Sequence, residues 1–208
     1  MSNAGIRMNN TVKYASAPVN GFSGELAYGL GETSGNSKAG RQLGAGLGYV
    51  RGPLSLRLGY ANVNSIPAAT ALTTGKTILL GGAYDFKVIK VSLGFASNKG
   101  TVNVNTRVDP NPSAKSHDTI LGVTVPLGAG NIRASSIIKQ DRRPTDRDAS
   151  QWGVAYNYFI SKRSDVYVAY ARINNDVLPG ATGFYTAGNA TEAGGGDRAF
   201  NVGMRHSF

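Results

Sequence analysis

The most constraining feature of this sequence is a side-chain pattern with a period of two. About eleven segments of about ten residues carry apolar side chains at one parity and small or polar side chains at the other. The clearest of them are residues 22–32, 39–51, 54–64, 76–86 and 150–161. This pattern is typical of β-strands, because successive side chains of a strand point to opposite faces. The chain is therefore expected to be all-β.

The breaks between the segments are alternately short and long. The short breaks have the composition of tight turns and cover residues 18–21, 52–53, 85–87, 127–130 and 161–163. Longer polar stretches lie around residues 33–38, 65–75, 98–115, 141–149 and 175–197. Strands joined by turns at one rim and loops at the other are expected of a membrane-spanning barrel. We therefore predict an antiparallel up-and-down transmembrane β-barrel, here an incomplete barrel of about eleven strands.

The face opposite the apolar one supports this choice over a packed sandwich. In residues 39–51, Gln42, Gly44, Gly46 and Gly48 alternate with Leu43, Ala45, Leu47 and Tyr49. Small residues of this kind offer no second apolar face for another sheet. Aromatic residues lie near strand ends, where interfacial girdles belong: Phe22, Tyr49, Tyr60, Tyr84, Phe86, Tyr158 and Tyr167.

Composition restricts the possible functions further. The 208 residues carry a net charge of +10 and contain no Cys. The basic residues are spread singly along the chain, which argues against a nucleic-acid partner. The two histidines, His117 and His206, form no catalytic or metal-binding pattern, so we expect no enzyme, metal or cofactor. Residues 1–208 are expected to form one domain, and Met1 to Gly5 lack the features of a signal peptide.

The last segment ends the chain with Phe200, Val202, Met204 and Phe208 at one parity, which we interpret as the outer-membrane insertion strand. Several pieces resemble the general porins of beta-proteobacteria and their neisserial relatives: residues 9–14, 121–126, 161–163, 170–175, 188–194 and 200–208. The resemblance implies a bacterial outer-membrane channel for passive diffusion of small hydrophilic solutes, in contact with outer-membrane lipid. It also implies a homotrimer of sixteen-stranded barrels when full length. The eleven segments would then be strands six to sixteen, with the signal peptide, the first five strands and the constriction loop missing, so the chain alone is not expected to be a competent pore.

If the apolar parity faces lipid, the other parity lines the pore. The basic residues predicted there are Arg7, Lys13, Arg57, Lys90, Arg133, Lys139, Arg172 and Arg205, and the acidic residues are Glu25, Asp85 and Asp118. An excess of positive charge along a narrow aqueous path favours anions. The alternative interpretation is a soluble or cell-surface all-β ligand-binding protein of the lectin or adhesin type, in which the long loops bind the ligand.

Overall fold

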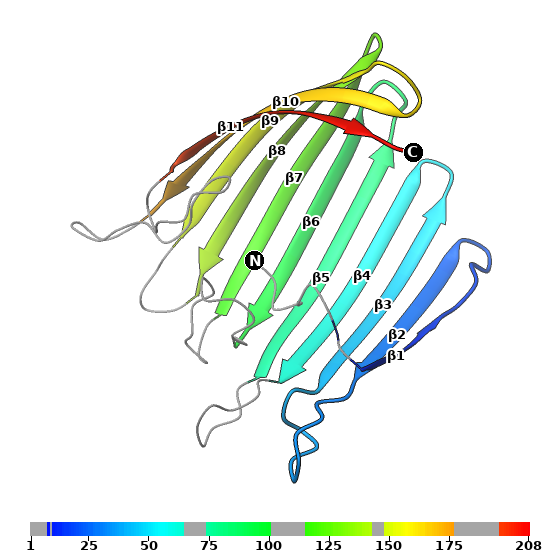
Figure 1. Ribbon diagram of the computed structural model, residues 1–208, viewed down its shortest axis with the longest axis vertical. Helices are drawn as coiled ribbons and strands as arrows, with labels where there is room; N and C mark the ends of the chain where they lie inside the picture. The colour runs from blue at the N-terminus through cyan, green and yellow to red at the C-terminus, as the bar shows by residue number, and fades with distance from the viewer. Residues whose placement is uncertain (1–7, 9, 65–73, 101–114, 143–147, 177–195) are drawn as a thin grey trace. The chain divides into compact units, whose positions relative to one another are not determined.

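The computed structural model describes residue 8 and residues 10–64, 74–100, 115–142, 148–176 and 196–208. Within them the chain forms eleven strands (Figure 1): β1 (Thr11–Ala15), β2 (Phe22–Gly29), β3 (Gln42–Arg51), β4 (Leu54–Asn64), β5 (Thr74–Asp85), β6 (Lys90–Lys99), β7 (Lys115–Leu127), β8 (Gly130–Asp141), β9 (Ala149–Phe159), β10 (Ser164–Asn175) and β11 (Arg198–His206). They form one sheet in which the strand order follows the sequence from β1 to β11. The predicted all-β meander is confirmed. This part of the chain contains no helix that is long and apolar enough to cross a membrane.

The chain divides into two compact units, and β5, β6, β7 and β8 each contribute residues to both. In the first unit, β1 to β4 pair antiparallel with continuous register. Gly46 of β3 lies between Glu25 and Gly59, and Leu47 lies between Gly24 and Leu58. Side chains of one parity therefore lie next to each other on neighbouring strands. Each of the two parities in the sequence forms one face of the sheet.

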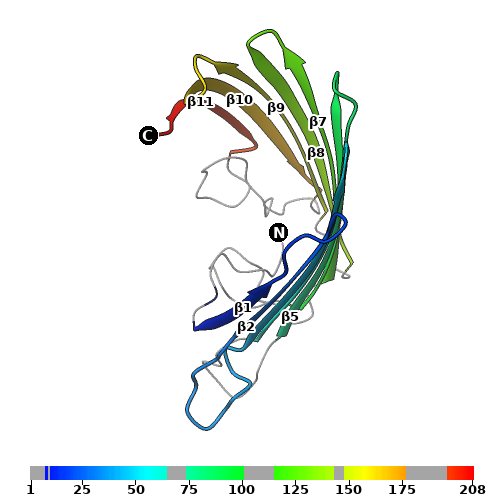
Figure 2. The same cartoon turned by 90° about the vertical axis from the view of Figure 1, so that its right-hand side faces the viewer.

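In the second unit, β8 to β11 pair antiparallel in the same manner. Val154 of β9 lies between Ala134 and Tyr170, and Asn157 lies between Asn131 and Tyr167. Figure 2 turns the view by 90°, and β10 and β11 still lie side by side, in agreement with their register.

Residues with positive φ close the short turns. Asn20 and Gly21 have φ of 52° and 88°, and Gly52, Lys87 and Gly128 have φ of 56°, 70° and 55°. Glycine and asparagine adopt this region with little or no steric cost, which explains their place in the predicted turns. Two predicted segments are too long, because β2 ends before Glu32 (φ 49°) and β3 begins after Gly40 (φ 71°).

The apolar face is exposed across both units. Leu47 retains 64% of its accessible surface and Phe200 retains 70%. The buried apolar residues within the described part of the chain are few and mostly small: Ala39, Val63, Ala96, Ala149 and Ile173. A soluble protein rarely leaves contiguous apolar surface of this kind uncovered. Such a face is instead suited to contact with hydrocarbon.

Candidate functional site

The polar face of the first unit carries a three-residue charged cluster. Lys13 Nζ lies 2.8 Å from Glu25 Oε2, and about half of each side chain is exposed. Lys13 and Glu25 stand on neighbouring strands at positions two residues apart in register, so their side chains meet on one face. Arg57 of β4 is exposed on the same face, opposite Gly48.

Two glycines make room for this cluster. A Cβ on Gly46 would lie 2.9 Å from Glu25 Cγ, and a Cβ on Gly48 would collide with the guanidinium of Arg57. The long charged side chains therefore lie along the wall of the sheet instead of standing away from it. A shallow depression of about 410 Å³ surrounds them, with Glu25, Arg57 and Leu79 among the residues that line it.

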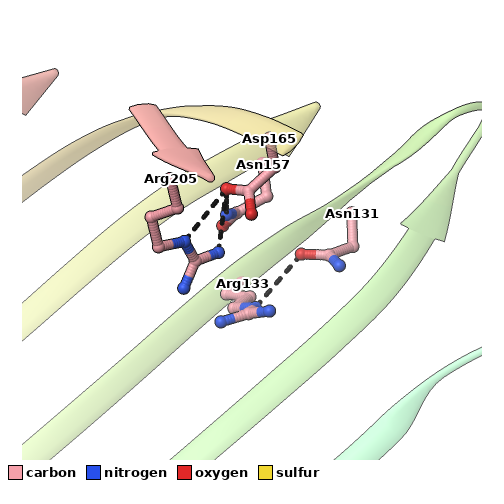
Figure 3. A network of polar contacts seen from close by, with 5 residues as sticks. All are labelled: Asn131, Arg133, Asn157, Asp165 and Arg205. Carbon is pink, nitrogen blue, oxygen red and sulfur yellow. Dashed lines mark hydrogen bonds and ion pairs between the residues drawn. The ribbon is translucent and has the colours of Figure 1, made fainter. Parts of the chain in front are cut away.

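The polar face of the second unit carries a second cluster, shown in Figure 3. Asp165 Oδ1 accepts hydrogen bonds from Arg205 Nε at 3.1 Å, Arg205 Nη2 at 2.9 Å and Asn157 Nδ2 at 3.1 Å. The guanidinium of Arg205 also lies 5.8 Å from the centre of the Tyr167 ring. On β8, Arg133 Nε donates a hydrogen bond of 3.1 Å to Asn131 Oδ1.

The two clusters have the same charge arrangement. Each contains one carboxylate that is paired with one cation, namely Glu25 with Lys13 and Asp165 with Arg205. Each also contains an arginine that forms no ion pair with any described residue: Arg57 in the first and Arg133 in the second. Each cluster is therefore positive by one charge.

Buried polar residues form a third group, in the first unit. Thr77 Oγ1 donates to Asn98 Oδ1 at 2.8 Å, and Asn98 Nδ2 donates to Asp118 Oδ2 at 2.8 Å and to Ser116 Oγ at 3.3 Å. This network ties β5, β6 and β7 together and satisfies polar groups that would otherwise be costly to bury. Within the described residues, no three His, Cys, Asp or Glu side chains are grouped as metal ligands.

Comparison with known proteins assigns the family. The sequence profile of the Gram-negative porins matches residues 1–178. The chain belongs to the Gram-negative porin family. Its relatives include outer membrane porin protein 32 of Delftia acidovorans, at 30% identity, and an outer membrane porin protein of Bordetella pertussis, at 25% identity. Each alignment covers 98% of this chain and 58% of the relative.

Solved structures agree with this assignment. The anion-selective porin from Comamonas acidovorans aligns with a TM-score of 0.78 and 26% identity, over 97% of this chain and 60% of that one. A trimer form of OmpT of Vibrio cholerae aligns with a TM-score of 0.69 and 16% identity, over 94% of this chain and 64% of that one, which shows the shared fold. The chain thus spans about 60% of the porins it matches, and it belongs to the outer membrane.

Most residues predicted to line the pore lie on the polar face of this porin chain. Register places Lys13, Glu25, Arg57, Arg133, Lys139 and Arg205 there. Alternation along β6 places Lys90 on the same side of the sheet as Asn98. Asp118 lies on that side as well, because its Oδ2 accepts a hydrogen bond from Asn98 Nδ2. The carboxylate of Asp85 instead closes a tight turn, since its Oδ1 accepts the backbone N–H of Lys87 at 2.7 Å. Arg7 lies outside the described residues.

The prediction that Arg172 belongs to the polar face is wrong. Its register partners are Trp152 and Arg198, so it shares the apolar face with Trp152 and Tyr170. Tyr167, which was expected in an outward aromatic girdle, lies on the polar face opposite Gly203 and Asn157. The alternation in β10 misled the sequence interpretation because both parities of this strand contain a tyrosine and alanine or valine residues.

Asp165 is the functional candidate that sequence reasoning missed. It is the second residue of β10, directly after a tight turn, and its partner Arg205 is 40 residues away. The period-two pattern alone could not have found it, because only the register of β10 with β9 and β11 shows that the parity shared by Asp165 and Tyr167 faces the polar side. In the last strand, Phe200, Val202 and Met204 lie on the apolar face, opposite Tyr170, Val168 and Val166. Phe208 follows the end of β11, and its ring lies 4.9 Å from that of His206.

Proposed function

We propose that this chain forms part of the wall of a water-filled outer-membrane pore, through which small hydrophilic solutes diffuse passively with a preference for anions. The observation that carries the proposal is the uncompensated arginine in each charged cluster, Arg57 and Arg133. Both are exposed on the polar face, where water can reach them. A permeating anion would gain from these charges, and a cation would be repelled.

Several further features support a pore over a binding protein or an enzyme. The apolar side chains on one face are exposed, as a lipid-facing wall requires, and the described strands belong to a single sheet with no second sheet packed upon it. A related porin is named anion-selective, which agrees with the sign of the clusters. The family and its fold are those of channels, and we propose that this member catalyses no reaction.

The complete assembly is also a proposal. We infer that residues 1–208 form one barrel domain, that the barrel is completed by further strands, and that it associates as a homotrimer. β1 and β11 stand at the two ends of the strand order. An edge strand leaves backbone groups without partners, which hydrocarbon cannot satisfy. We therefore propose that the 208-residue chain alone does not conduct stably.

Charge removal in a complemented porin tests the proposed selectivity. In this complemented porin, the chain replaces the matching segment of the Delftia acidovorans relative. In water, a unit charge about 7 Å from a permeating ion changes the electrostatic energy of that ion by about 0.6 kcal/mol. This energy corresponds to roughly a threefold change in the local concentration of the ion. Arg57→Ser and Arg133→Ser should therefore each lower the anion-to-cation permeability ratio by up to roughly threefold, measured from reversal potentials in planar bilayers.

Arg172→Ser is the matched control, because it removes the same charge from the apolar face. This variant should leave the reversal potential unchanged. In a separate measurement, the 208-residue chain without the rest of the Delftia acidovorans porin should give no stable conductance steps. If neither Arg57→Ser nor Arg133→Ser moves the reversal potential toward cations, the assignment of the polar face to the pore is wrong.

A further inference from the structure

The apolar face of the second unit contains two arginines directly opposite each other. Arg172 of β10 and Arg198 of β11 are register partners, and Trp152 is the partner of Arg172 on its other side. Like charges in this position repel each other and destabilise a sheet. The carboxylate of Asp197 lies 3.4 Å from Arg198 Nε, so it compensates one of the two charges.

Unlike Arg198, Arg172 has no carboxylate partner among the described residues. Its Nε atom is buried and has no hydrogen-bond partner among the described residues. Leaving a buried donor without a partner destabilises the fold, and the cost is greater when the group is charged. An acceptor that carries negative charge would remove both the cost of this donor and the repulsion between the two arginines.

An apolar groove begins beside this pair. It has a volume of about 430 Å³ and is lined by Tyr170, Val168, Val154, Tyr156, Ile132 and Leu127. Tyr170 is two residues from Arg172 on the same face, and Leu127 begins a tight turn at the other end of the strands. A ligand that occupies both the arginine pair and the groove therefore needs an anionic head group joined to an apolar tail.

We propose that Arg172, Arg198 and this groove form a binding site for a phosphate-bearing lipid. The two guanidinium groups would donate hydrogen bonds to the phosphate, a geometry for which arginine is well suited. One acyl chain would lie along the groove toward Leu127. Trp152 and Tyr170, whose ring centres are 5.5 Å apart, would pack at the level of the head group. The inference rests on the proposed placement of the apolar face against lipid.

The single tryptophan of the chain, Trp152, reports directly on this site. The 208-residue chain is placed in mixed micelles of detergent and lipid with brominated acyl chains, which quench tryptophan on contact. The lipid is either phosphatidylglycerol, which is anionic, or phosphatidylcholine, which is zwitterionic. The relative binding constant at Trp152 should favour phosphatidylglycerol several-fold in the wild-type chain. Excess inorganic phosphate should not reverse the quenching, because it lacks the acyl chain.

Three variants assign the preference to the two arginines. Arg172→Gln and Arg198→Gln should each reduce it, and the double variant should bring the ratio close to one. Arg198 is largely exposed, so its substitution tests the site without disturbing a buried position. Arg163→Gln removes the same charge at the tight turn before β10 and should keep the wild-type ratio.

The outcomes separate this proposal from the proposed function. Equal quenching by the two lipids in the wild-type chain, or a preference that survives both substitutions, would overturn the lipid site while leaving the pore intact. Relief of quenching by inorganic phosphate would show that free phosphate competes and would contradict the lipid as ligand. If neither lipid quenches Trp152, the face is covered by protein or water, and both proposals fail.

Discussion

Leu47→Arg is expected to destabilise the complemented porin in lipid vesicles by about 2–4 kcal/mol. Leu47 lies on the apolar face in the middle of β3, between Gly24 and Leu58. A charged side chain at the midplane of a bilayer costs about 2–4 kcal/mol on the lipid face of a barrel. The free energy of unfolding, measured by urea titration in vesicles, should fall by that amount.

Gly44→Arg is the matched control in the same strand. It introduces the same side chain with the opposite parity, where a new Cβ would make only ordinary contact, 3.7 Å from Ala27 Cβ. Its cost should remain below about 1 kcal/mol, as expected for a water-facing substitution. Equal losses in the two variants would show that the two faces of β3 do not differ in environment.

Gly31→Ala is expected to destabilise the connection between β2 and β3 by about 1–3 kcal/mol, the usual cost of forcing extra volume into a packed site. A Cβ at Gly31 would collide with the backbone carbonyl of Ala39, and it would lie 2.8 Å from the backbone nitrogen of Arg41. Backbone atoms cannot move aside as the end of a side chain can, so the connection must shift. Ala39 is fully buried, which leaves little room for such a shift.

The measurement is again the midpoint of urea unfolding, with Gly44→Ala as control. Gly44 has an ordinary φ and space for a Cβ, so this variant should unfold at nearly the wild-type midpoint. Hydrogen exchange should locate the loss to residues 30–41. A wild-type midpoint for Gly31→Ala would mean that the close approach of residues 31 and 39 does not contribute to stability.

The faces of the sheet could be predicted from sequence wherever one parity is clearly apolar. In β3, leucines and glycines alternate, and the register confirms the predicted division. In β10, Tyr167 and Tyr170 have opposite parities, and only the register with β9 and β11 decides which one faces the polar side. The error on Arg172 has this cause.

The pairing within the charged clusters could not be predicted, because it depends on register between strands. Asp165 and Arg205 are brought together only by the alignment of β10 with β11. Lys13 and Glu25 lie in strands that are joined by one tight turn, yet their contact also depends on the exact register of that hairpin. The sequence therefore indicated an excess of positive charge, but it did not show which cations are compensated.

A scan of spin labels along β9 tests the central claim, that one face of the sheet contacts hydrocarbon and the other contacts water. The chain contains no cysteine, so single cysteines at residues 151–157 can be labelled without background. In lipid-containing micelles, labels at positions 152, 154 and 156 should be relaxed mainly by oxygen, which concentrates in hydrocarbon. Labels at positions 151, 153, 155 and 157 should be relaxed mainly by a water-soluble nickel complex. Uniform accessibility along β9, or the opposite alternation, would contradict the account.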